Sequence, residues 1–299
     1  MYMEPILYID RKKQEIEEEI VPSGRMLSWF YNKSLGKASL HLLMKRKLIS
    51  TLGGWYMNRR ISKKRIDKFI EQNNMDLSIY KVTDSTRYRT FNDFFYRAIE
   101  PKYRPIGDGV VSPADGRLLA FQNLKDVSSF FIKGSEFSLK SFLRSDRKAK
   151  KYTDGSMVIV RLAPADYHRF HFPAAGTISR AKRIKGRYFS VSPLALKKSL
   201  EIFCQNHRVV STLKTEEFGD ILMIEVGATM VGSIKQTYKA DSSIKKGEEK
   251  GYFAFGGSTV VLLFEKGKVS IDADLIANTN KGLETKLEMG EQIASAAKG

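Results

Sequence analysis

Two histidines lie three residues apart in the segment Asp166-Tyr-His-Arg-Phe-His-Phe-Pro173. On a strand this spacing would put the His168 and His171 rings on opposite faces, whereas in an irregular segment the rings could converge. The closing proline and an Ala-Pro pair just upstream favour an irregular segment. The pair alone leaves two arrangements open: a catalytic site, or one partly exposed ring and one ring hydrogen-bonded in the core. A metal site is not favoured, because the chain has only two other histidines and no acidic cluster lies nearby.

Two further segments carry an acid and a hydroxyl. Ser112-Pro-Ala-Asp-Gly116 has the composition of a tight turn, which needs no chemistry, but it could also hold Asp115 rigidly at a strand end. Phe255-Gly-Gly-Ser-Thr259 precedes an apolar run that predicts a buried strand over 260–264. Taken separately, each segment is explained as an ordinary turn.

Together the three segments supply an acid, a base and a nucleophile. In such a relay the base takes the hydroxyl proton and the acid orients the base. The Gly-x-Ser-x-Gly elbow of hydrolases is absent, because Thr259 and Val260 follow Ser258. Gly257 leaves its own carbonyl sterically open, so the Ser258 hydroxyl could attack the peptide bond that precedes it.

The secondary structure that must position these residues changes in type at Pro101, from predicted helices to predicted strands. Before it, the sequence predicts helices at about 62–72 and 91–99. After it come short β-rich runs separated by turns, among them 156–162, 221–226 and 259–264. We therefore expect an α+β fold, in which an N-terminal helical part over 1–90 precedes a β-rich catalytic domain over 91–299.

The chain is strongly basic. Its 299 residues include 51 Lys and Arg against 33 Asp and Glu, a formal net charge of +18, and residues 24–75 alone hold 12 basic and 2 acidic side chains. This surplus implies an anionic partner, for which nucleic acid and an acidic membrane surface are the leading classes. A single cysteine, Cys204, excludes an intramolecular disulfide and fits a reducing, intracellular setting.

One basic region combines charge with an apolar stripe. Apolar residues recur every four positions from Leu40 to Leu52 and lead to Trp55 and Tyr56, with lysines at the edge of the stripe. The stripe could pack against the rest of the protein, or it could lie in a lipid interface where cations meet anionic headgroups. No window reaches the roughly 18 apolar residues of a spanning helix, so we expect any membrane contact to be peripheral.

Two more segments join the three above, namely Phe189-Ser-Val-Ser-Pro-Leu194 and Val226-Gly-Ala-Thr-Met-Val-Gly-Ser-Ile234. In this order and spacing, the five motifs resemble phosphatidylserine decarboxylase. The resemblance covers residues 90–299, and the basic helices before them resemble the membrane-binding region of that family. One departure is visible: many members have Leu-Gly-Ser-Thr at the processing site, where this chain has Gly256 before Gly257.

The resemblance implies a self-cleavage relay of Asp115, His171 and Ser258. His171, oriented by Asp115, would activate Ser258 to attack the Gly257 carbonyl, and elimination from the resulting ester would cut the chain. Residues 1–257 would become a β chain, and the remaining 42 residues would become an α chain that completes the sheet. Ser258 would pass through dehydroalanine to an N-terminal pyruvoyl group.

The resemblance also implies the reaction, in which phosphatidylserine becomes phosphatidylethanolamine and CO₂. Loss of CO₂ leaves a carbanion that no ordinary side chain can accept, so a Schiff base between the pyruvoyl ketone and the serine amine would provide the electron sink. His168 is the candidate for contacting the substrate carboxylate or for protonating the carbanion. Phe170, Phe172, Phe253 and Phe255 could line a lipid path, although core packing is the commoner role.

The expected partners follow from this interpretation. They are phosphatidylserine as substrate, an anionic membrane surface at the cytoplasmic side of the cell membrane, and a heterodimer of the α and β chains, with higher oligomers left open. No RNP, KH or zinc-finger pattern supports nucleic-acid binding. The alternative is an unprocessed, inactive relative that only binds a lipid surface.

Overall fold

The computed structural model describes residues 6–19, 53–127, 138–186, 205–227, 234–254, 256 and 258–297. The apolar stripe from Leu40 to Leu52 lies outside the described residues, as do the motif at 189–194 and the Gly257 half of the predicted cleavage site.

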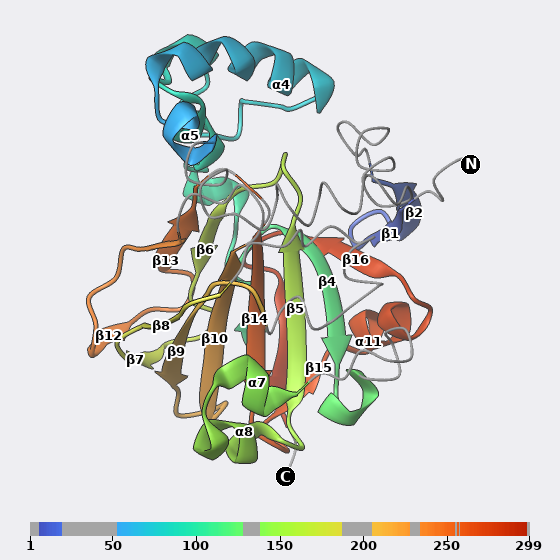
Figure 1. The fold of residues 1–299 in the computed structure, drawn as a ribbon. Helices are drawn as coiled ribbons and strands as arrows, with labels where there is room; N and C mark the ends of the chain where they lie inside the picture. The colour runs from blue at the N-terminus through green and yellow to red at the C-terminus, as the bar shows by residue number, and fades with distance from the viewer. Residues whose placement is uncertain are drawn as a thin grey trace, which may run out of the picture.

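An 11-stranded sheet dominates the fold (Figure 1). Along its main path, with β8 beside β9, the strands are β12 (Ser242–Ile244), β7 (Gly176–Ile178), β9 (Arg208–Lys214), β10 (Asp220–Gly227), β14 (Ser258–Phe264), β5 (Ser156–Leu162), β4 (Gly116–Phe121), β16 (Glu284–Leu287), β1 (Leu7–Asp10) and β2 (Glu15–Glu18), and β8 spans Lys182–Ile184. Neighbouring strands are antiparallel except β1 and β16, which are parallel.

Two three-stranded sheets complete the β structure. One has the order β11 (Ile234–Gln236), β13 (Glu249–Phe253) and β6 (Arg169–His171), and the other has the order β15 (Val269–Ile271), β17 (Gln292–Ala296) and β3 (Val110–Val111). Side chains from both pack with one face of the large sheet in a single hydrophobic core.

Strand β14 lies in the interior of the large sheet, between β10 and β5. Its whole length is buried, as its apolar sequence predicts. Successive side chains point to opposite faces: Val260 and Leu262 join the core shared with the small sheets, whereas Val261 belongs to the core on the other face. The C-terminal segment therefore completes the sheet, and the predicted α+β fold is confirmed.

Short helices surround the sheets. They are η2 (Arg60–Arg65), α4 (Ile66–Gln72), η3 (Ser85–Arg87), α5 (Phe91–Phe95), η4 (Pro101–Tyr103), η5 (Leu124–Asp126), α7 (Leu139–Leu143), α8 (Asp146–Tyr152) and α11 (Ala273–Asn280). Within the described ranges, none of the helices has the length and apolar character needed to cross a membrane.

Residues 53–100, here called the helical unit, lie above the ends of the strands (Figure 1). Aromatic rings hold α4 and α5 together, with the Phe69 and Phe91 centroids 5.3 Å apart at nearly a right angle. The helix predicted over 91–99 ends at Phe95, because the chain turns to form a bridge between Ile99 and Tyr80.

The predicted domain boundary at residue 90 stays a prediction, but two details of the structure bear on it. Strands β1 and β2 belong to the large sheet rather than to the helical unit. The core of the helical unit also continues past residue 90, because Phe91, Phe94 and Phe95 pack there with Met57 and Ile66.

Candidate active site

Ser258 is the first residue of β14 and is fully buried. Its backbone pairs with Gly227 on β10 and with Leu162 on β5. Neither its Oγ nor the Oγ1 of Thr259 has a hydrogen-bond partner among the described residues. Leaving a buried hydroxyl unpaired costs about 1–3 kcal/mol, so these two oxygens need an explanation beyond packing.

The chain just before Ser258 is conformationally unusual. Gly256 has φ +141°, a region that residues with a side chain rarely adopt. A leucine, which many family members have at this position, would be strained in that conformation. Gly256 is therefore matched to the backbone conformation two residues before Ser258.

His168 is fully buried in the connection between β5 and β6. Its Nδ1 donates to the Asp166 carbonyl at 2.8 Å, its Nε2 has no partner among the described residues, and its ring lies 3.8 Å from the Phe95 ring of α5. Burial lowers the pKa of His168 from 6.5 to about 4. Because a carbonyl can only accept, the neutral ring carries its proton on Nδ1 and exposes the lone pair of Nε2 to the buried site.

The connection that carries His168 is held from two sides. The Asp166 carboxylate accepts the Ala163 N–H at 2.6 Å and the Arg117 guanidinium at 2.6 Å. Arg97, itself buried, donates to the carbonyls of Ala165 at 2.7 Å and Asp166 at 3.3 Å. The carbonyl that fixes the His168 tautomer is thus bound by an arginine of the helical unit.

His171 ends β6, and both of its ring nitrogens have partners. Nδ1 donates to the Gly247 carbonyl at 2.9 Å, and Nε2 lies 3.1 Å from the Tyr167 hydroxyl. Burial lowers the pKa of His171 and raises that of Tyr167, so a protonated phenol donates to a neutral ring. His171 could reach another partner through Nε2 only by giving up Tyr167.

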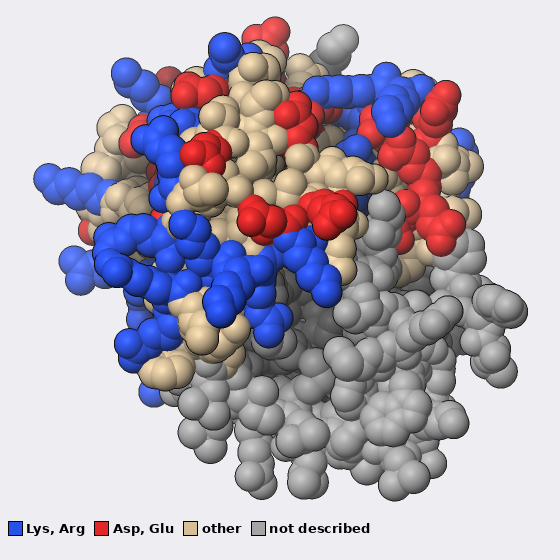
Figure 2. Space-filling view, turned by 90° about the horizontal axis from the view of Figure 1, so that it is seen from above, with Lys and Arg blue, Asp and Glu red and all other residues tan. Residues whose placement is uncertain are grey.

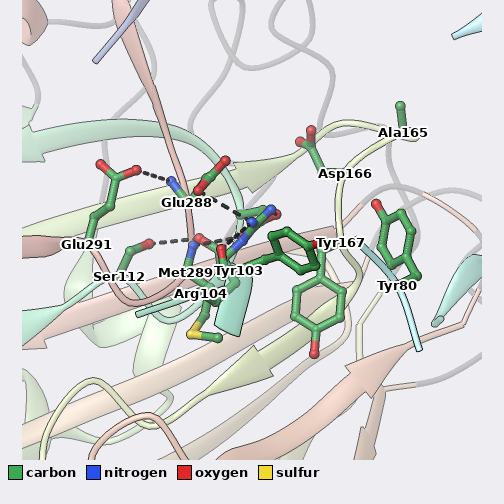
Figure 3. A network of polar contacts seen from close by, with 12 residues as sticks. Tyr80, Tyr103, Arg104, Ser112, Ala165, Asp166, Tyr167, Glu288, Met289 and Glu291 are labelled. Carbon is green, nitrogen blue, oxygen red and sulfur yellow. Dashed lines mark hydrogen bonds and ion pairs between the residues drawn. The ribbon is translucent and has the colours of Figure 1, made fainter. Parts of the chain in front are cut away.

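Asp115 lies in the turn before β4, where Arg104 binds its carboxylate through two nitrogens, at 2.9 and 2.5 Å. Figure 3 shows the polar network around Arg104 and Met289. The Met289 N–H also donates to this carboxylate at 2.8 Å. Burial raises the pKa of Asp115, while Arg104 and the Met289 amide oppose that shift. Asp115 therefore ties the turn to residue 289, in the segment that follows the predicted cleavage site.

The structure does not join Asp115 to His171 by a hydrogen bond within its described residues. The two are brought near each other only through the backbone, because the His171 N–H donates to the Pro113 carbonyl at 2.7 Å. The predicted relay would need His171 and Asp115 to exchange the partners that they have here.

Strand register distinguishes the two histidines. His171 is opposite Glu249 on β13, whereas the His168 carbonyl accepts the Phe253 N–H at 2.9 Å. Phe253 precedes Gly257 by four residues, and Glu249 precedes it by eight. The connection to His168 also begins at Leu162, the β5 partner of Ser258. By strand register, His168 is thus paired with chain segments that lie nearer in sequence to Ser258 than those paired with His171.

Arg97, Arg104 and Tyr167 were not identified from the sequence. Tyr167 could have been found, since it lies inside the two-histidine segment. Nothing in the sequence separates the two arginines from the rest of the 51 basic residues. Phe170, Phe172 and Phe253 are fully buried, which places them in the hydrophobic core, and Phe255 lies outside the described residues.

Comparison with known proteins gives one consistent result. Residues 91–295 match the family described as phosphatidylserine decarboxylase. A phosphatidylserine decarboxylase proenzyme of Fusobacterium nucleatum is 52% identical, and the alignment covers 99% of this chain and 99% of that protein. Proenzymes of the same name from Desulfitobacterium hafniense and Clostridium botulinum are 43% and 42% identical, over 98% and 97% of this chain and 99% of each relative.

Proposed function

The chain belongs to the phosphatidylserine decarboxylase family, and from that premise we propose that it converts phosphatidylserine to phosphatidylethanolamine and CO₂. The observation that carries this proposal is the buried Ser258 Oγ, which has no hydrogen-bond partner among the described residues, at the Gly-Ser pair where the family resemblance predicts processing. Relatives that match nearly the whole chain are proenzymes, and no observation favours a protein that only binds lipid.

We propose that Ser258 makes the cofactor by cutting the chain. Its Oγ attacks the Gly257 carbonyl carbon, the hydroxyl proton passes by way of a base to the departing nitrogen, and the amide becomes an ester. Elimination then removes the Cα proton of residue 258 to a base and breaks the Cβ–Oγ bond, which leaves a carboxylate on Gly257 and dehydroalanine at 258. Addition of water and loss of ammonia give the pyruvoyl group. The proenzyme names of the relatives support such processing.

The residues around Ser258 fit this group. The Oγ, which has no partner in the described part of the chain, lies at the start of β14, two residues after Gly256 with its unusual backbone conformation. When present, the pyruvoyl group supplies the electron sink that decarboxylation of an amino acid requires. We keep His171 as the proposed base for cleavage, with Asp115 as its orienting acid, on condition that Nε2 is released by Tyr167.

For His168, the geometry favours proton transfer over contact with the substrate carboxylate. A neutral ring whose Nδ1 proton is directed at the Asp166 carbonyl has no proton to donate from Nε2. Nε2 can instead accept one proton from the substrate ammonium group and return it to the carbon that loses CO₂. Phe95 and Arg97 hold the ring and its connection in place for this exchange.

We further propose that the enzyme acts at an anionic membrane surface, on the cytoplasmic side of the cell membrane. The acyl chains of the substrate stay in the bilayer, and the net charge of +18 favours an anionic surface. Fractionation of cells tests this, since the protein should sediment with membranes and be released by high salt. Recovery in the supernatant at low salt would contradict it.

The reaction is tested with phosphatidylserine labelled in the serine carboxylate and presented in mixed micelles. We expect release of labelled CO₂ together with an equal amount of phosphatidylethanolamine. A preparation in which the chain is fully cut but releases no CO₂ would contradict the proposed substrate.

A further inference from the structure

A cleft of about 660 Å³ opens on the helical unit. We call it the arginine cleft, after three of the residues that line it, which are Asn58, Arg59, Arg60, Arg89, Thr90, Asp93 and Tyr96. These residues come from η2, from α5 and its C-terminal end, and from the turns before the two helices. The cleft lining does not include Ser258 or His168, which are both fully buried.

The cleft carries uncompensated positive charge. Within the described part of the chain, no carboxylate forms an ion pair with Arg59, Arg60 or Arg89. The single acid of the lining, Asp93, accepts the backbone N–H of Arg89 at 3.0 Å. Arginine side chains that line one cleft without carboxylate partners are suited to bind an anion with several oxygens, because each guanidinium can donate two parallel hydrogen bonds.

Exposed apolar side chains flank the cleft. Trp55 and Ile61 are 56% and 57% exposed, and Arg59 lies over the Trp55 ring at 4.2 Å. Exposed tryptophan beside cations is typical of segments that lie at the headgroup level of a bilayer. The view from above, onto the side where the helical unit lies, also shows Lys and Arg gathered in a broad group (Figure 2).

The cleft is also connected to the histidine segment. Nε of Arg169 donates a hydrogen bond to the Tyr96 carbonyl at 2.8 Å, and the centroids of the Tyr96 and Tyr252 rings are 4.5 Å apart. Arg169 directly follows His168, and Tyr252 is its partner on β13. Tyr96 therefore connects the cleft with the β6–β13 pair, which begins directly after His168.

We propose that the arginine cleft binds the phosphodiester of an anionic bilayer lipid while Trp55 and Ile61 enter the interface. This inference deepens the proposed function, on which its choice of a lipid surface rests. It assigns docking to a discrete site with a defined ligand chemistry, in addition to the diffuse attraction of the basic surface. The site orients the helical unit on the bilayer with the histidine segment behind it.

The test uses the full-length protein and vesicles of phosphatidylglycerol and phosphatidylcholine at 30:70. One variant pairs Arg60→Gln with Arg89→Gln, and its control pairs Lys64→Gln with Lys68→Gln. The control removes the same charge from exposed positions of the same unit, outside the cleft. We expect the arginine pair to weaken sedimentation with vesicles by roughly tenfold or more, and the lysine pair by less than about threefold. Equal losses would overturn the proposal, because net charge alone would then explain binding.

A second measurement separates a site from a charged surface. Dihexanoylphosphatidylglycerol below its micelle concentration should bind saturably, one to one, in titration calorimetry, while inorganic phosphate should bind far more weakly. Replacing Arg60 and Arg89 together by lysine keeps the charge and should still weaken this binding severalfold, since a lysine cannot donate in the same two-pronged way. Unchanged binding by the lysine variant, or phosphate binding as tight as that of the lipid, would overturn the proposal.

The outcome is independent of catalysis. The vesicles contain no phosphatidylserine, so binding is measured whether or not the protein is a decarboxylase. Loss of CO₂ release with intact cleft binding would count against the proposed function only. Equal melting temperatures of the variants check that the exposed substitutions leave the fold intact.

Discussion

Two pairs of predicted site residues differ in how their polar atoms are bonded. In the first pair, Asp115 and His171, the carboxylate and both ring nitrogens have hydrogen-bond partners, although the two residues do not bond each other. We call these two residues the bonded pair. His168 and Ser258 form an open pair, because Nε2 and Oγ are buried without partners among the described residues. Both pairs are buried, so exposure does not distinguish them.

The difference separates atoms that hold the structure from atoms that are free to react. Arg104 and the Met289 amide use Asp115 to connect the turn before β4 with the C-terminal segment. That connection would persist between the α and β chains after cleavage. At the open pair, the polar atoms without partners among the described residues raise the free energy of the folded state, and a hydrogen bond to a substrate or a reacting group can remove that penalty.

The largest effect is expected from Ser258→Ala, which removes the nucleophile and the source of the cofactor. The protein should remain a single chain on denaturing electrophoresis and should release no CO₂ above background. Efficient cleavage of this variant would refute the assignment of the nucleophile.

The two histidines should separate turnover from processing. We expect His168→Ala to be cut normally and to lose about 10²–10⁴-fold in decarboxylation rate, as is typical for loss of a proton-transfer group. His171→Ala should instead slow processing, which a time course of chain cleavage measures. If His168→Ala blocked cleavage and His171→Ala did not, the two roles would have to be exchanged.

Asp115→Asn tests whether the bonded pair has a structural role. Removing the carboxylate charge leaves the buried Arg104 with only Glu288, at 3.3 Å, as a counterion and weakens two charge-assisted hydrogen bonds, which should lower the free energy of unfolding by about 1.5–3 kcal/mol in urea denaturation. Combining it with Arg104→Met should recover much of that loss. If the double variant regains stability but still processes slowly, Asp115 also acts in the relay; if processing returns with stability, its role is structural only.

Stability should rise with pH in the window set by His168. The pKa of this histidine is about 4 in the fold against 6.5 as the ordinary value, so between these values the unfolded chain binds more protons. Above about pH 6.5 the ring is neutral in both the folded and the unfolded chain, so its protonation does not affect stability. As the pH falls from there toward 4, the free energy of unfolding decreases by about 3 kcal/mol in total. Urea unfolding between pH 4.5 and 7 measures it, with His168→Gln as control. An equally steep profile in that variant would contradict the assignment.

Thr259→Val should give the smallest effect, and one of opposite sign. It replaces a buried hydroxyl that has no partner within the described ranges with a methyl group of similar shape, so the free energy of unfolding should rise by about 1 kcal/mol while cleavage continues. A loss of cleavage would mean that Thr259 also belongs to the open pair's chemistry.

Local patterns predicted the framework well. The runs 156–162, 221–226 and 259–264 lie within β5, β10 and β14, because continuous apolar stretches between turns form buried central strands. The helix expected at 62–72 is present as η2 followed by α4. The pairing of β1 with β16 joins residues far apart in sequence, and no local pattern indicates it.

The site was predicted as a set of residue types but not as a set of bonds. The motifs identified Asp115, His168, His171 and Ser258, whereas their hydrogen-bond partners depend on the tertiary fold. Arg104, at the end of η4, meets Asp115 only in the tertiary fold. In a chain with many basic residues, the sequence does not indicate which arginine makes this contact. Which histidine has an open nitrogen is likewise decided by the carbonyls and hydroxyls around each ring.

The central claim is that Ser258 becomes the reactive group of this decarboxylase, and intact mass of a sample that is turning over phosphatidylserine tests it most directly. We predict two chains, residues 1–257 and 258–299, with the second lighter by one ammonia than a fragment that begins with serine. Turnover by an uncut chain of 34.0 kDa would contradict the account.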